Sequence, residues 1–272
     1  MANIAQYLRR APTIAVIRLE GVIGGGARLG APALNDKEAA GRIERAFRRG
    51  RPVAVALAIN SPGGSPTQSA LIAARIRRLA DEKGLRVYAF CEDVAASGGY
   101  WLATAADEIY ADANSILGSI GVISAGFGLN EFIARYGIER RVYTAGEDKS
   151  MLDPFRPERE RDIERLKDLQ QVIHGNFIDQ VKARRGKALA ERDLFTGEIF
   201  VGQQAVDVGL ADGLGHLVPM MKHKYGDEVR FAETRPRRGL LARFGGQGGA
   251  GAALGDLFAT LEDRAAWGRY GL

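Results

Sequence analysis

The sequence predicts an α/β fold in which a mostly parallel sheet is built from repeated βα units and has helices on both faces. Short apolar runs with the length of strands alternate with segments of helical periodicity along residues 13–144, a pattern typical of a parallel sheet. Residues 53–59 are almost continuously apolar, as expected of a strand buried on both faces. Glycine-rich turns follow two of the strands, at the carboxyl edge where proteins of this class bind ligands.

Each element follows from a local pattern. Asn35 and Asp36 are helix-capping residues, so the first helix is expected at 37–49. The second helix is expected at 65–79, where the sequence is amphipathic. The expected strands are 13–19, 53–59, 87–91, 108–111, 120–123 and 140–144, with a further short strand at 194–197. The remaining expected helices are 97–106, 130–136, a long charged helix at 157–182 and a short helix at 205–212.

Composition divides the 272 residues into three segments. Residues 1–12 form an N-terminal extension, and residues 13–233 form the main domain. Residues 234–272 form a basic and glycine-rich linker, expected to be flexible, with a short amphipathic segment at 254–267. Because 46% of the residues are hydrophobic, the chain has enough apolar surface for a substantial core.

Charge, cysteine content and the N-terminus indicate partners and location. The net charge of +5 comes from 38 basic and 33 acidic residues that are interleaved, so we expect no nucleic-acid partner. The single cysteine, Cys91, ends an apolar strand and is expected to be a core residue in a reducing compartment. The sequence has no apolar run of the length of a signal peptide or a membrane span, which predicts a cytoplasmic protein.

Ser97 is the candidate nucleophile. It lies among small residues, Ala-Ala-Ser-Gly-Gly at 95–99, where a strand leads into a helix. No neighbouring side chain would therefore block the approach of a substrate carbonyl. All three histidines lie far downstream, whereas Lys149 follows the strand-like run 140–144. A Ser/Lys pair is the arrangement that this order favours.

The choice of lysine at position 149 supports this interpretation. Eight of the 38 basic residues are lysines, so lysine is the minority choice where only charge is needed. A general base must release its proton, which a desolvated lysine can do and an arginine cannot. The simpler alternative is a solvated surface lysine beside Glu147 and Asp148.

A second glycine-rich turn, Asn-Ser-Pro-Gly-Gly at 60–64, ends the most buried strand. Gly63 and Gly64 leave backbone N–H groups uncovered, and such donors stabilise the oxyanion of acyl transfer. Together with Gly98 and Gly99, they are expected to line a substrate groove. The alternative is an ordinary βα turn, in which Pro-Gly is common.

Four ordered motifs resemble the signal peptide peptidase A family of serine peptidases, family S49. They are Asn-Ser-Pro-Gly-Gly at 60–64, Ala-Ser-Gly-Gly-Tyr at 96–100, Gly-Ser-Ile-Gly-Val at 118–122, and Lys149 ahead of Asp-Pro-Phe-Arg at 153–156. The resemblance implies a ClpP/crotonase-like fold with Ser97 as nucleophile and Lys149 as general base. It also implies that the Gly64 amide lies in the oxyanion hole and that Ser119 hydrogen-bonds and orients the lysine amine.

The resemblance further implies an enzyme that needs no metal or other cofactor and cleaves unfolded or short apolar peptides. Single-copy members form a homo-oligomeric ring or dome in which a neighbouring subunit completes the active site, so the long helix at 157–182 is an expected assembly surface. The family usually carries an N-terminal membrane anchor, whereas this chain starts close to its first strand. We therefore expect a single-copy, cytoplasmic form whose contact with a membrane, if any, is peripheral.

Two other functions fit parts of the pattern. A crotonase-like acyl-CoA enzyme would use the two glycine-rich turns to polarise a thioester, but it would leave Ser97 and Lys149 without a role. A non-catalytic oligomeric scaffold would retain the fold and bind peptides without cleaving them. The leading hypothesis is a serine endopeptidase with a Ser/Lys dyad.

Overall fold

The computed structural model describes residues 11–24, 34–234 and 264–271 of the chain. These residues divide into two compact units. Unit 1 comprises the described residues within Met1–Ile120 and Gln180–Leu272, and unit 2 comprises Gly121–Asp179. All strands of the described sheet belong to unit 1.

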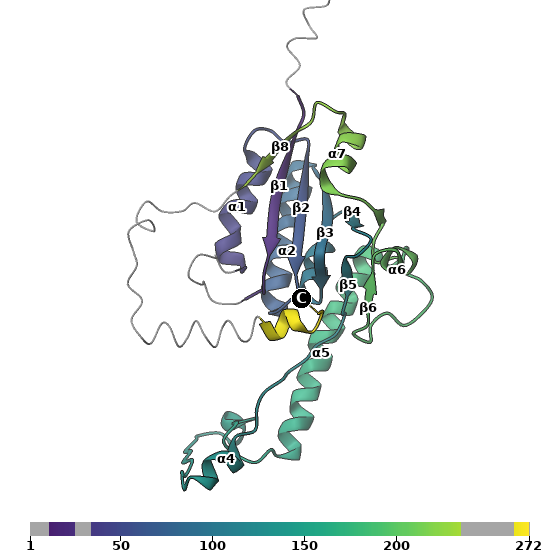
Figure 1. The fold of residues 1–272 in the computed structure, drawn as a ribbon. Helices are drawn as coiled ribbons and strands as arrows, with labels where there is room; N and C mark the ends of the chain where they lie inside the picture. Colours follow the sequence, from purple (N-terminus) through teal and green to yellow (C-terminus); the bar gives the residue numbers. More distant parts are fainter. Residues whose placement is uncertain (1–10, 25–33, 235–263, 272) are drawn as a thin grey trace, which may run out of the picture. The chain divides into compact units, whose positions relative to one another are not determined.

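Unit 1 is built on one sheet of eight described strands (Figure 1). The strands are β1 (Thr13–Glu20), β2 (Ala54–Ser61), β3 (Arg86–Ala96), β4 (Glu108–Ala111), β5 (Ile116–Gly118), β6 (Ile199–Val201), β7 (Gly213–Leu214) and β8 (Arg230–Glu233). Their order is β6-β5-β3-β2-β1-β8, and β4 pairs with both β3 and β7. Among the described pairs only β5–β6 is antiparallel. The predicted α/β fold with a mostly parallel sheet is therefore confirmed.

The helices are α1 (Asp36–Arg48), α2 (Pro66–Lys83), α3 (Gly98–Ala103), α4 (Asn130–Arg135), α5 (Glu160–Arg185), α6 (Gln203–Asp207) and α7 (Leu217–Tyr225), with a 3-10 turn η2 (Glu147–Ser150). Local sequence explains where the first two begin and end. The Asn35 side chain accepts the Glu38 N–H at 3.0 Å and caps α1. Ser65 caps α2, which ends at Gly84 in the left-handed conformation (φ 61°) that glycine adopts without steric cost.

The central strands form the core and fix the position of the turns that follow them. Every residue from Ala54 to Ile59 in β2 is fully buried, which explains the continuous apolar run. Helices α1 and α2 bury Ile43, Phe47 and Ile76, and each such side chain stabilises the fold by about 1.5–3 kcal/mol. Because β1, β2 and β3 are parallel, their carboxyl ends lie at the same edge of the sheet, at the arrowheads in Figure 1.

Two predicted strands between residues 120 and 144 are wrong. Residues 120–123 are not extended in a sheet, and the strand of this region is β5, which begins four residues earlier than the pattern suggested, at Ile116. Gly118 and Ser119 have φ values of 96° and 50°, and this left-handed backbone ends the strand. Residues 140–144 form no strand either. They belong to unit 2, which contains no described strand.

The C-terminal part of the domain also differs from the prediction. The short strand expected at 194–197 is wrong, because these residues form no strand and β6 begins only at Ile199, after Gly197 with its left-handed φ of 86°. The helix expected at 205–212 is α6, which ends before Gly209, a residue with a φ of 79°. Helix α7 and strand β8 were not predicted. Strand β8 pairs in parallel with β1 from Thr13 to Val16, so it extends the sheet at the edge opposite β6.

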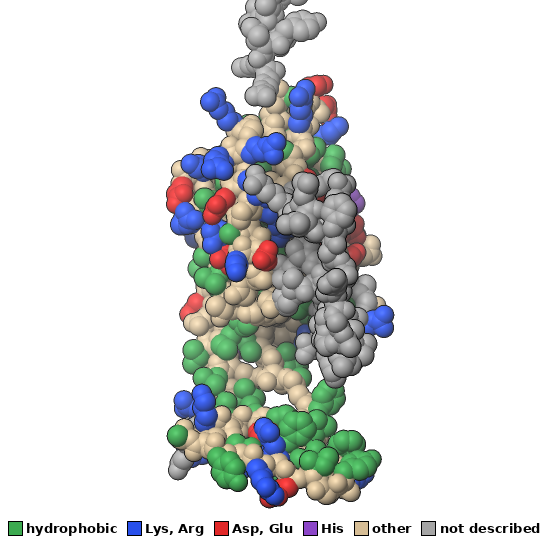
Figure 2. Space-filling view, turned by 90° about the vertical axis from the view of Figure 1, so that its left-hand side faces the viewer, with side chains coloured by type: hydrophobic (Ala, Val, Ile, Leu, Met, Phe, Trp, Pro, Cys, Tyr) green, Lys and Arg blue, Asp and Glu red, His purple; other side chains and the backbone are tan. Residues whose placement is uncertain are grey.

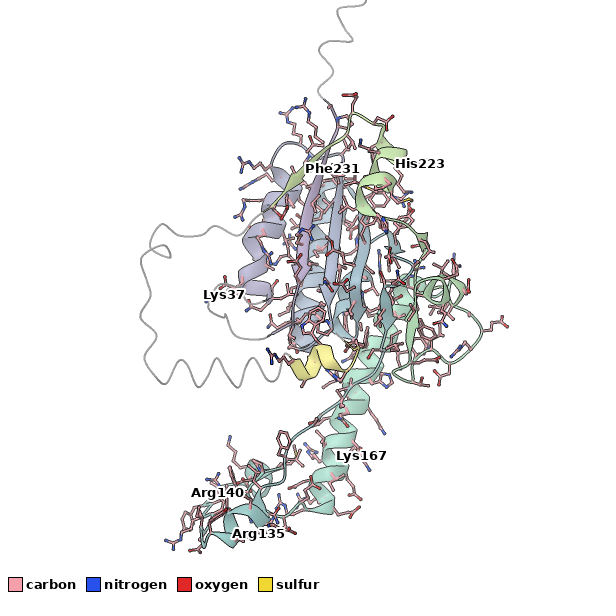
Figure 3. All side chains as sticks on the ribbon, viewed as in Figure 1. Lys37, Arg135, Arg140, Lys167, His223 and Phe231 are labelled. Atoms are coloured by element: carbon pink, nitrogen blue, oxygen red, sulfur yellow. The ribbon has the colours of Figure 1, made fainter. Side chains whose placement is uncertain are left out.

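Unit 2 has almost no core of its own. Among its described side chains only Asp162 and Phe177 are buried, and α4 has no buried residue. Its large hydrophobic residues are exposed instead: Ile123, Phe127, Phe132, Tyr136, Ile138, Tyr143, Leu169 and Val172. Figure 2 shows hydrophobic side chains gathered on the surface around α4, and Figure 3 labels two basic residues of the same unit, Arg135 and Arg140.

The predicted segment boundaries at 1–12, 13–233 and 234–272 stay a prediction. Most of the N-terminal extension and of the linker lies outside the described residues, as does most of the amphipathic segment at 254–267. Residues 264–268 are helical, and 269–271 form a turn. In the described part of the chain, none of the helices combines the length and the apolar character needed to cross a membrane.

Candidate active site

Ser97 occupies the junction between β3 and α3. Its backbone has φ 52° and ψ −122°, a conformation that costs an L-residue free energy and persists only where the surroundings impose it. Its N–H donates to the Gly118 carbonyl at 2.8 Å, which ties the turn to the end of β5. Ser97 is half-buried, whereas its neighbours Ala96 and Gly98 are buried, so its hydroxyl is the polar group of this turn that can reach a substrate.

The two glycine-rich turns predicted from the sequence pack directly against each other. A Cβ atom on Gly63 would lie 2.8 Å from the Ser97 Cβ and 2.8 Å from the Gly98 nitrogen. A Cβ atom on Gly99 would lie 2.3 Å from the Ser61 carbonyl oxygen. These spaces are too small for any side chain, so glycine is required at both turns for backbone to contact backbone.

Two backbone amides beside Ser97 are uncommitted. The Gly63 N–H donates to the Ser61 hydroxyl at 3.2 Å, and that hydroxyl donates to the Gly21 carbonyl at 2.7 Å. By contrast, no hydrogen bond joins the amide of Gly64 or of Gly98 to another described residue. Ile23 hydrogen-bonds on either side of Gly64, to Gly63 and Ser65, which fixes the Gly64 peptide without using its N–H.

Ser119 lies in the loop that follows β5. It has a φ of 50°, and its N–H donates to the Glu198 carbonyl at 2.7 Å. Since the preceding residue, Gly118, accepts the Ser97 N–H, Ser97 and Ser119 sit at the ends of paired strands. Ser119 is half-buried, and the Tyr270 hydroxyl lies 3.3 Å from its Oγ.

Lys149 is carried by the other unit. It belongs to η2 in unit 2, and its side chain is exposed. Its N–H donates to the Gly146 carbonyl at 3.3 Å, closing the turn. The structure thus brings Gly63, Gly64, Ser97, Gly98, Gly99 and Ser119 together in unit 1, while the candidate base lies in unit 2.

Sequence reasoning missed the residues that support the nucleophile turn. The Tyr100 hydroxyl, at the start of α3, donates to the Leu210 carbonyl at 2.9 Å, and burial raises the pKa of Tyr100, so this donor stays protonated. Arg185 donates to the Gly209 carbonyl and to the Asp212 carboxylate. The segment 209–212 therefore holds the start of α3 in place through the Tyr100 hydrogen bond. The sequence feature that could have indicated this role is a tyrosine directly after a glycine pair.

Unit 1 also contains the reactive side chains of Cys91 and His216. Burial raises the pKa of Cys91 to about 12, so its thiol is protonated near neutral pH and a poor nucleophile. His216 pairs with Asp112 at 2.7 Å, on the wall of a cavity of about 450 Å³. Among the described residues, histidine, cysteine and carboxylate side chains form no cluster of three or more that could hold a metal ion.

The profile of Peptidase family S49 matches residues 80–224. The chain belongs to peptidase family S49. The matched region runs from the end of α2 to α7 and so includes Ser97, Ser119 and Lys149. The resemblance found in the sequence motifs is thereby confirmed at the level of the family.

Individual relatives agree with this assignment in their shared region. The chain is 32% identical over 166 residues to a putative signal peptide peptidase SppA of Enterococcus faecium, covering 60% of this chain and 47% of that protein. It is 32% identical over 169 residues to the chloroplastic serine protease SPPA of Arabidopsis thaliana, covering 60% of this chain and 24% of that protein.

A further relative matches over more of the chain. A Brucella melitensis protein named Na(+)/H(+) antiporter NhaA is 49% identical over 271 residues, which is 95% of this chain and 37% of that protein. The chain thus spans less than half the length of each of these three relatives.

Proposed function

We propose that this chain is a serine endopeptidase in which Ser97 is the nucleophile and Lys149 the general base. The observation that carries the proposal is the backbone of Ser97, held at φ 52° and ψ −122° between two interlocked glycine turns. A strained, half-buried serine at the carboxyl end of a central strand is the arrangement in which a hydroxyl can attack a carbonyl without hindrance. Membership of peptidase family S49 supports the same reaction.

In the proposed reaction, the neutral amine of Lys149 takes the Ser97 hydroxyl proton while the Ser97 oxygen attacks the carbonyl carbon of a peptide bond. The resulting ammonium gives its proton to the leaving nitrogen, the C–N bond breaks, and an ester remains on Ser97. Water then adds to the ester with Lys149 again as base, the resulting ammonium returns this proton to the Ser97 oxygen as the ester C–O bond breaks, and the acid product leaves. Every proton is accounted for by these two side chains and water, so no cofactor takes part.

The uncommitted amides supply the electrostatic part of this reaction. The Gly64 N–H is proposed to donate to the oxyanion, and the Gly98 N–H, next to the nucleophile, offers a second donor. Each such donor contributes about 3 kcal/mol to transition-state stabilisation. Gly63 and Gly99 allow the two turns to approach closely enough for both amides to serve one groove.

Ser119 is proposed to hold the Lys149 amine by a hydrogen bond. Its hydroxyl lies at the end of the strand that pairs with the nucleophile strand, and its backbone is fixed by hydrogen bonds from Ser119 to Glu198 and from Ser97 to Gly118. A serine hydroxyl oxygen can accept a hydrogen bond from one N–H of the amine and leave the lone pair of the nitrogen for Ser97. Ser119 would thus be a positioning residue.

A homo-oligomer is part of the proposal, because unit 2 lacks what a stable, active unit requires. Eight large hydrophobic side chains of unit 2 are exposed, and its described part buries two side chains, so a neighbouring copy is the expected cover. The exposed Lys149 points to the same conclusion. Burial favours the neutral form of a lysine that a general base requires, and a neighbouring subunit would cover this side chain.

The proposed substrates are unfolded or short apolar peptides, because a groove formed by backbone between two strand ends accepts an extended chain. The proposed compartment is the cytoplasm, and peripheral contact with a membrane stays a prediction. Mass spectrometry after treatment with a fluorophosphonate probe tests the proposal. We expect an adduct on Ser97 that is lost in Ser97→Ala and strongly reduced in Lys149→Ala. Absence of an adduct on a folded, oligomeric protein would overturn the serine mechanism and favour the acyl-CoA or scaffold alternatives.

A further inference from the structure

The C-terminal segment, residues 264–271, reaches the two loops that flank Ser97. The Tyr270 hydroxyl lies 3.3 Å from the Ser119 Oγ and 3.5 Å from the Pro62 carbonyl oxygen. Pro62 directly precedes the glycine turn, and Ser119 follows β5. Figure 1 shows this segment, in yellow, at the carboxyl edge of β2 and β3.

Backbone hydrogen bonds within the segment fix the position of Tyr270. Its helical turn ends at Gly268, the Tyr270 N–H donates to the Trp267 carbonyl at 2.9 Å, and the Gly271 N–H donates to the Gly268 carbonyl at 3.2 Å. Gly271 has a left-handed φ of 77°, which reverses the chain just after the tyrosine. Tyr270 and Trp267 are half-buried, whereas Arg269 between them is exposed. One face of the segment is thus in contact with the protein.

The two partners of the Tyr270 hydroxyl, Pro62 and Ser119, belong to the two loops that contact the Ser97 turn. The Ser97 N–H is bound to the carbonyl of Gly118, next to Ser119, and the site of a Gly63 Cβ lies 2.8 Å from the Ser97 Cβ. A hydroxyl that spans Pro62 and Ser119 therefore lies across the approach to Ser97. A peptide substrate has to enter between the same two loops to reach the Gly64 amide.

Tyr270 also engages the group that the proposed mechanism reserves for Lys149. The Ser119 hydroxyl has a single proton and two lone pairs, and a hydrogen bond with the tyrosine occupies one of these positions and the space beside it. We infer that the C-terminal segment is an intramolecular inhibitor, which covers Ser97 and takes Ser119 from the lysine amine. This inference rests on the proposed serine mechanism.

Covalent connection makes this inhibition independent of protein concentration. The segment belongs to the same chain as the site, so its effective concentration is set by the chain and does not fall on dilution. A peptide substrate has to compete with it for the groove. The expected result is a protein with a low reactivity at Ser97 that rises when the segment is removed or displaced.

The test compares the full chain with a chain that ends after Asp263, using the rate of fluorophosphonate labelling at Ser97. We expect labelling to be at least about tenfold faster in the truncated chain, because a tethered blocker works at millimolar effective concentration. Tyr270→Phe keeps the ring and loses the hydroxyl, so it should raise the rate by about fivefold, as expected for one hydrogen bond. Arg269→Ala, a change at the exposed neighbour, should leave the rate unchanged.

A synthetic peptide with the sequence of residues 264–272 provides the converse test. It should slow labelling of the truncated chain, and the same peptide with phenylalanine in place of the tyrosine should be weaker. Equal labelling of full and truncated chains, or slower labelling after truncation, would overturn the inhibitor while leaving the serine mechanism intact. Absence of labelling in both chains would overturn the mechanism and the inhibitor together.

Discussion

The surroundings of Ser97 and of Lys149 differ in almost every physical respect. Ser97 lies between buried strands of unit 1, where glycine turns leave no space even for a methyl group. Lys149 lies exposed on unit 2, whose described part buries Asp162 and Phe177. The proposed nucleophile is thus held by buried packing, whereas the proposed base lies on a unit whose described part leaves eight large hydrophobic side chains exposed. This difference motivates the proposal that a neighbouring copy covers Lys149, and the predictions below test it.

Complementation between inactive variants gives the largest expected effect. Ser97→Ala and Lys149→Ala should each be inactive alone, with losses of at least about a thousandfold. After subunit exchange, an equimolar mixture should recover about a quarter of wild-type peptidase activity if each site combines two chains. Continued inactivity of fully exchanged oligomers would place both residues in one chain. The same mixture assayed before subunits exchange is the control, and it should be inactive.

Matched glycine substitutions extend the comparison to stability. In Gly99→Ala the new Cβ would lie 2.3 Å from the Ser61 carbonyl oxygen, which should lower the free energy of unfolding by about 3 kcal/mol and abolish probe labelling. Gly175→Ala in α5 places a Cβ where no atom lies within 4 Å, and should stabilise the helix by about 1 kcal/mol. Thermal unfolding measures both. Similar Tm changes for the two variants would contradict the difference in packing between the units.

Substitutions of exposed apolar residues test whether unit 2 is the assembly surface. Phe127 is 85% exposed in unit 2, and Val218 is 48% exposed in unit 1. Phe127→Ser should weaken association by about thirtyfold if its ring is an anchor in the contact between copies. Val218→Ser is the matched control and should leave association unchanged. Sedimentation velocity over a concentration series distinguishes them, and equal effects would remove the special role of unit 2.

Apolar runs and small-residue turns in the sequence correctly predicted the strands and turns of unit 1 whose side chains are buried. The apolar run at 53–59 is β2 and fully buried from Ala54, and the turn at Ser97 follows from small residues that are adjacent in sequence. The pattern at 140–144 failed as a strand prediction: Tyr143 is 91% exposed, and unit 2 contains no described strand with which this run could pair. Apolar periodicity indicates that a run of residues can be buried, but it does not show that a neighbouring strand is present to pair with it.

The contact between Tyr270 and Ser119 lies beyond local sequence reasoning for a different reason. The two residues are 151 positions apart, and neither has a pattern that specifies the other. Likewise, the uncommitted amides of Gly64 and Gly98 become apparent only when the two glycine turns are seen in contact. The sequence predicted which glycine turns could supply backbone N–H donors. Which of these donors stay uncommitted, and which side chains contact the turns, depends on tertiary packing.

The smallest expected effect concerns the buried carboxylate of unit 2. Arg159 donates two hydrogen bonds to Asp162 and thereby lowers the pKa of that carboxyl. Because the pKa is lower in the folded state, the charged carboxylate stabilises the fold at pH values above the pKa of the unfolded state. This contribution is lost as the pH falls through the pKa of the folded state. Asp162→Asn should therefore lower Tm by a few degrees at pH 7 and lose its effect in acid, where both forms are neutral. Asp168→Asn, an exposed site on the same helix, is the control. An equal Tm change for Asp162→Asn at neutral and acid pH would show that volume, and not charge, holds this part of unit 2.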